Sequence, residues 1–167
     1  MNKLAIHGGK KIRNISMPSR FAFGINEELE MNKMIKYYKD KGEDPKYSGV
    51  WEEKFCKKFV NFMGGGYADA VATGTGAIYV ATKSLELPKN SEILISPVTC
   101  SGALSCIIES GHQPVLIDSK PNSYNTDLNE IKKRITKKTR AMQITHAAGE
   151  PVSEMEEIIR FAKKNNI

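Results

Sequence analysis

Residues 91–118 read SEILISPVTCSGALSCIIESGHQPVLID. Two short apolar runs, at residues 92–96 and 114–118, flank a segment in which apolar residues recur with helical spacing. A strand, a helix and a second strand in this order predict a parallel βαβ unit. Similar apolar runs at residues 68–72 and 140–145 are separated from it by amphipathic segments. The sequence therefore predicts an α/β fold, with a parallel sheet and flanking helices.

The N-terminal part of the sequence has a different pattern. Helical spacing of apolar residues predicts one helix from an N-cap at Asn26 to Gly42, and a second helix that ends at Gly64. The second helix carries an aromatic stripe, which we expect to pack in the core: Trp51, Phe55, Phe59 and Phe62. We therefore expect two regions, an N-terminal arm with helices in residues 1–66 and an α/β domain in residues 67–167.

Composition and charge narrow the class of protein. The 167 residues are 40% hydrophobic and 26% charged, as in a globular domain. No apolar run approaches the roughly 18 to 20 residues of a membrane span, and the start lacks the apolar core of a signal peptide. We expect a cytoplasmic protein without a membrane partner. The net charge of +6 raises the possibility of nucleic acid, but the basic segment 132–140 has no interleaved aromatic residue, so we expect a solvated surface.

The cysteines and histidines do not predict a metal centre. Cys56, Cys100 and Cys106 lack the spacing of a zinc site and are too few and odd in number for a disulfide framework. The three histidines also share no metal-ligand spacing. We expect reduced thiols and no bound metal.

The segment Thr73-Gly74-Thr75-Gly76-Ala77 lies between a predicted strand and a predicted helix. Small residues at a helix N-terminus let backbone N–H groups approach an anion, which predicts a phosphate cradle. A plain turn that uses the conformational freedom of glycine explains the same residues equally well. The dinucleotide pattern GxGxxG is excluded because Tyr79 stands where its third glycine belongs, and no P-loop pattern is present.

Cys100 and His146 follow two of the predicted strands, so both should lie at the carboxyl edge of the sheet, where open α/β sheets bind ligands. The Cys100 thiol is either a nucleophile or a small packing residue. We expect His146 to face a cleft, whereas His7 and His112 are interpreted as surface or core residues.

Several segments together resemble the N-terminal part of the DegT/DnrJ/StrS family of PLP-dependent sugar aminotransferases. The segment TGTGAI is similar to the family's SGTAAL turn. The matching segments occur in the family's order: 4–9, 47–55, 73–78, 92–99, 111–118, 124–125, 135–141 and 145–149. The resemblance implies the N-terminal part of a fold-type-I, aspartate aminotransferase-like large domain. That domain would be truncated, with its C-terminal part absent.

The resemblance also implies pyridoxal 5'-phosphate as the cofactor of the complete enzyme. The family's turn holds the cofactor phosphate, which assigns Gly74, Thr75 and Gly76 to cofactor binding. Cys100 stands where the family usually has an aromatic residue that stacks on the cofactor ring, so we expect weaker ring binding there. We assign His146 to substrate binding.

The family's ring-nitrogen aspartate and cofactor-binding lysine correspond to no residue of this sequence, so we assign no catalytic residue. The implied partners are a nucleotide-linked keto-deoxysugar, an amino-acid donor, and a second copy or a complementing C-terminal fragment. We expect these residues to be inactive alone. Two alternatives remain open: a non-catalytic binding or scaffold module, and the family's dehydratase branch, in which histidine replaces the lysine.

Overall fold

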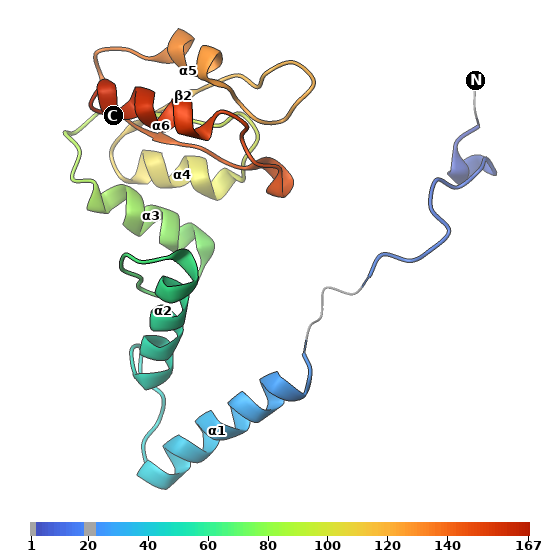
Figure 1. Ribbon diagram of the computed structural model, residues 1–167, viewed down its shortest axis with the longest axis vertical. Helices are drawn as coiled ribbons and strands as arrows, with labels where there is room; N and C mark the ends of the chain where they lie inside the picture. Colours follow the sequence, from blue (N-terminus) through green and yellow to red (C-terminus); the bar gives the residue numbers. More distant parts are fainter. Residues whose placement is uncertain (1–2, 19–22) are drawn as a thin grey trace. The chain divides into compact units, whose positions relative to one another are not determined.

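The computed structural model describes residues 3–18 and 23–167 (Figure 1). The chain divides into two compact units, Met1–Ala68 and Asp69–Ile167. The predicted boundary between residues 66 and 67 lies close to this division. No helix in the described ranges combines the length and the apolar composition that a membrane crossing requires.

The first unit contains a short 3-10 helix and two α-helices. These are η1 (Ala5–His7), α1 (Ile25–Lys41) and α2 (Val50–Met63). The helices α1 and α2 end at Gly42 and Gly64, whose φ angles of 64° and 84° are left-handed, so both predicted ends are confirmed. The predicted N-cap Asn26 is wrong. Gly24 caps α1, and its N–H donates to Glu27 Oε2 at 2.8 Å.

An edge-to-face pair of Tyr37 and Trp51, with ring centroids 6.4 Å apart, joins α1 to α2. The prediction that the aromatic stripe is core is wrong for the remaining rings. Phe55, Phe59 and Phe62 are 58%, 45% and 84% exposed, respectively. Helical spacing shows which side chains share a face, but burial also requires a surface to pack against.

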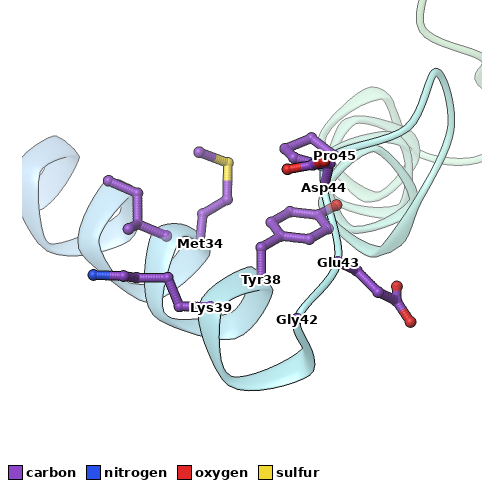
Figure 2. A pocket seen from close by; sticks show the side chains of 8 residues that line it. Met34, Tyr38, Lys39, Gly42, Glu43, Asp44 and Pro45 are labelled. Atoms are coloured by element: carbon purple, nitrogen blue, oxygen red, sulfur yellow. The ribbon is translucent and has the colours of Figure 1, made fainter.

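A pocket of about 390 Å³ lies where α1 ends. Figure 2 shows Met34 and Tyr38 of α1 beside the turn that follows Gly42, with the Tyr38 ring directed toward Asp44 and Pro45. None of the residues predicted for cofactor or substrate binding lines this pocket. The residues predicted for cofactor and substrate binding all belong to the second unit.

The second unit is built on a parallel sheet with the strand order β2-β1-β3. Its elements are α3 (Gly74–Ser84), β1 (Glu92–Ile95), α4 (Ser101–Glu109), β2 (Gln113–Leu116), α5 (Leu128–Arg134), β3 (Thr139–Gln143), η2 (Ala147–Gly149) and α6 (Met155–Lys164). Ile95 is in register with Leu116 of β2 and Gln143 of β3, so the three strands end together. The predicted parallel α/β fold is confirmed.

The central strand β1 is buried on both faces. Leu94 packs in one cluster with Ile131 of α5 and Ile158 of α6. Ile93 and Ile95 point to the opposite face and pack with α4, as expected from the alternation of side chains along a strand. Figure 1 accordingly shows α5 and α6 on one side of the second unit and α3 and α4 on the other.

The strand predicted at residues 68–72 is not formed. A strand needs a neighbour that accepts and donates its backbone hydrogen bonds, and no described strand pairs with this segment. Val71 is 41% exposed, so the apolar run does not contribute to the core. The segment instead leads directly into α3.

Candidate functional site

The N-terminus of α3 has free hydrogen-bond donors. Thr73 is the N-cap: its Oγ1 accepts from the N–H of Gly76 at 2.9 Å, and its carbonyl accepts from Ala77 at 3.0 Å. The first N–H groups of a helix have no acceptor within the helix. In the described part of the chain no group accepts from the N–H of Gly74 or Thr75. These two donors are available to an external acceptor.

The helices α3 and α4 begin next to each other. A Cβ atom built on Gly102 would lie 2.7 Å from Thr75 Oγ1 and 3.2 Å from Thr75 Cγ2. The Cys106 thiol also donates to the Thr75 carbonyl at 3.3 Å. Only glycine at position 102 allows this approach without displacement of Thr75. The sequence alone does not point to Gly102, because the contact that requires glycine there is with a residue distant in sequence.

The charge distribution at these two helix ends favours an anion. Each helix N-terminus carries about half a positive charge. Neither α3 nor α4 has an acidic residue in its first turn, whereas each of the other described α-helices has at least one. The partial charges of α3 and α4 are thus not compensated locally. Their adjacent N-termini form an arrangement that can hold a phosphate group.

Cys100 lies at the same edge of the sheet. It is the N-cap of α4 and its side chain is exposed, without a capping hydrogen bond. The exposure contradicts the interpretation of Cys100 as a packing residue. The other two cysteines, Cys56 and Cys106, are buried.

Side-chain hydroxyls tie the carboxyl ends of β1 and β3 together. The buried Ser96 accepts from the N–H of Thr145 at 2.8 Å, and the hydroxyl of Thr145 donates to that of Thr99 at 3.2 Å. Thr99 and Thr145 immediately precede Cys100 and His146. The structure therefore brings both predicted residues to one edge.

His146 is exposed and its ring is oriented by the backbone. Its Nδ1 accepts from the N–H of Val152 at 3.0 Å. Because Nδ1 is an acceptor in this bond, the ring proton of the neutral side chain is placed on Nε2. His146 thus offers one N–H donor at the carboxyl edge. Of the other two histidines, His112 is buried and His7 is exposed.

The edge is suited to binding an anionic, polar ligand. It combines two free backbone N–H groups, two helix N-termini, the Cys100 thiol and the His146 ring. In the described ranges, no group of three or more His, Cys, Asp or Glu residues is arranged to hold a metal ion. The site residues Gly74, Thr75, Gly76, Cys100 and His146 all lie at this edge or at the start of the helices that border it.

The parallel sheet with helices on both faces places this chain among the open α/β folds, a class of fold that binds ligands at the carboxyl ends of its strands. The chain belongs to the DegT/DnrJ/EryC1/StrS aminotransferase family, whose sequence profile matches residues 30–167. The resemblance seen in the sequence is confirmed.

Relatives include the GDP-perosamine synthase of Escherichia coli O157:H7, which is 29% identical over 71% of this chain and 32% of its own length. The dTDP-3-amino-3,6-dideoxy-alpha-D-galactopyranose transaminase of Aneurinibacillus thermoaerophilus is 30% identical over 69% of this chain and 31% of its own length. The chain spans about a third of the length of these curated relatives.

Among solved structures, NtdA from Bacillus subtilis with the bound cofactor PMP is similar to this chain, with a TM-score of 0.77. The match covers 95% of this chain and 37% of the NtdA chain, at 22% sequence identity. The similarity shows that this chain has the fold of the corresponding part of the NtdA chain.

Proposed function

We propose that this chain supplies the cofactor-phosphate and substrate-facing part of a PLP-dependent sugar-nucleotide aminotransferase. The complete enzyme would work in the cytoplasm and transfer an amino group from an amino acid to a nucleotide-linked keto-deoxysugar, in surface-polysaccharide or amino-sugar biosynthesis. The observation that carries this proposal is the pair of uncompensated helix N-termini at Thr75 and Gly102. The names of the relatives support the sugar-nucleotide substrate class.

The residues present fit the phosphate of PLP. The N–H groups of Gly74 and Thr75 would donate to phosphate oxygens. The Thr75 hydroxyl belongs to the same turn of α3 and faces Gly102 at the start of α4. PLP, when bound, supplies an electron sink for amino-group chemistry. Thr73 holds the first turn of α3 in place through its bond to Gly76, and thereby orients these donors.

The remaining site residues would contact other parts of the ligands. Cys100 would lie along the cofactor ring, where its thiol offers less contact area than an aromatic face. His146 would donate from Nε2 to the substrate. Residues 1–66 would form the arm and helices, and residues 67–167 the partial PLP-binding domain. We propose that activity requires a complementing C-terminal part within a homodimer.

The proposal is tested by mixing the chain with PLP, adding borohydride, and locating modified lysines by mass spectrometry. We expect no single lysine to be modified in preference to the others, because none corresponds to the family's cofactor-binding lysine. Stable modification of one lysine would contradict the absence of that residue. Addition of a C-terminal part from a family member should be needed for aminotransfer.

The phosphate cradle is tested with Thr75→Val. The chain should bind PMP more tightly than pyridoxamine, which lacks the phosphate, and the substitution should weaken only PMP binding. Loss of one hydrogen bond to a charged group costs about 1.5–3 kcal/mol, or roughly ten- to hundredfold in affinity. Isothermal titration with both ligands measures the difference. Equal affinity of the wild-type chain for PMP and pyridoxamine would instead favour a non-catalytic scaffold module.

A further inference from the structure

The turn that follows His146 has an unusual backbone. It contains η2, in which Ala148 has a φ of 52° and Gly149 a φ of 83°. A left-handed conformation is uncommon for a residue other than glycine and persists only where neighbouring interactions hold it. Both ends of this turn are fixed by one side chain, that of Asn125.

Asn125 is 1% exposed and uses both halves of its amide. Its Oδ1 accepts from the N–H of Ala147 at 2.9 Å, and its Nδ2 donates to the carbonyl of Glu150 at 2.8 Å. The amide orientation is unambiguous, because only oxygen accepts from an N–H and only nitrogen donates to a carbonyl. Asn125 thus closes the turn from Ala147 to Glu150.

The backbone of Asn125 is itself anchored. Its N–H donates to Ser123 Oγ at 3.0 Å, and its carbonyl accepts from the N–H of Lys120 at 3.0 Å. The side chain therefore starts from a fixed point in the segment between β2 and α5. This segment, far from His146 in the sequence, sets the position of the turn.

The turn determines where the His146 ring can point. His146 immediately precedes Ala147, and its Nδ1 accepts from Val152, which follows the turn. The His146 side chain therefore bridges the turn, from its own backbone to the N–H of Val152. Asn125 holds the backbone between these two points through its bonds to Ala147 and Glu150. If the turn opened, the distance between His146 and the N–H of Val152 would no longer be fixed.

We infer that Asn125 is a positioning residue, which holds the His146 ring with Nε2 as a donor at the carboxyl edge of the sheet. The inference rests on the proposed function, in which His146 contacts the substrate. A hydrophobic residue at position 125 would fill the space but leave the Ala147 N–H and the Glu150 carbonyl unpaired.

The test compares Asn125→Ala with Thr126→Val by amide hydrogen exchange and by the ¹⁵N signal of His146 Nδ1. Thr126 is equally buried, but its hydroxyl has only a 3.5 Å contact with the Asp127 carbonyl. In Asn125→Ala the Val152 amide should exchange about tenfold faster or more, as expected for loss of a fixed hydrogen bond, and the Nδ1 signal should shift. In Thr126→Val both should stay as in the wild-type chain.

A second variant, Asn125→Asp, keeps the size of the side chain but replaces the Nδ2 donor to the Glu150 carbonyl with an acceptor. This variant should also make the Val152 amide exchange faster. It keeps the test decisive if Asn125→Ala does not fold. Wild-type exchange of Val152 and an unchanged Nδ1 signal in a folded variant would overturn the inference. Neither readout needs a cofactor, so failure here is distinct from failure of PMP binding.

Discussion

The Gly102→Ala chain should bind PMP at least tenfold less tightly than the wild-type chain, and it should unfold at a lower urea concentration. The added methyl group would lie 2.7 Å from Thr75 Oγ1, which is too close for any real contact. Either the Thr75 side chain rotates away or α3 moves from α4. Inserting a methyl group into a close contact costs about 1–3 kcal/mol of stability. Both movements also disturb the donors at the N-terminus of α3.

The matched control is Ser105→Thr, which adds one methyl group on an exposed position of the same helix. It should leave PMP binding unchanged. Pyridoxamine binding separates the two possible effects of Gly102→Ala. If the cradle holds the phosphate, PMP affinity falls and pyridoxamine affinity stays. An equal loss for both ligands would show general damage to the site, and unchanged PMP affinity would exclude phosphate binding at Thr75.

The sheet could be predicted from the sequence because its central strand is a short apolar run and the strands alternate with helical segments. The expected strands at residues 92–96, 114–118 and 140–145 correspond to β1 (Glu92–Ile95), β2 (Gln113–Leu116) and β3 (Thr139–Gln143). A strand that is buried on both faces is apolar throughout, so its sequence identifies it without alternation. Ile93, Leu94 and Ile95 show this directly.

Two incorrect predictions, the strand at residues 68–72 and the buried aromatic stripe, concern features that depend on a partner surface. Residues 68–72 have the composition of a strand, but no described strand pairs with them. Phe55, Phe59 and Phe62 have the spacing of a packed helix face, yet they are exposed. Composition and spacing describe the segment alone, whereas pairing and burial belong to the segment and its neighbour together.

The candidate site was predicted in part. The helix start at Gly74 and Thr75 could be predicted, because small residues after an apolar run are a local signal. Gly102 and Asn125 were not assigned, since each is explained by one contact with a residue distant in sequence. Asparagine is common in loops for reasons of local turn geometry. Asn125 differs from such a residue only through its two hydrogen bonds to the turn from Ala147 to Glu150.

The largest loss of stability is expected for Leu94→Ala. Leu94 is 0% exposed and lies in the central strand, where it packs with Ile131 of α5 and Ile158 of α6. Its neighbours Ile93 and Ile95 face α4, so no adjacent side chain of β1 can fill the space that Leu94 leaves. A cavity would form between the sheet and the two helices.

Truncation of a buried leucine costs about 2–5 kcal/mol, with the higher values where the surroundings cannot collapse. We expect Leu94→Ala in the upper part of this range, because β2 and β3 hold β1 on both sides and prevent it from moving into the cavity. Leu116→Ala is the control, since Leu116 is 57% exposed and its loss should cost only about 0.5 kcal/mol. Urea unfolding followed through the amide signals of β1 measures both values. Similar losses for the two variants would show that the α5–α6 layer does not depend on Leu94.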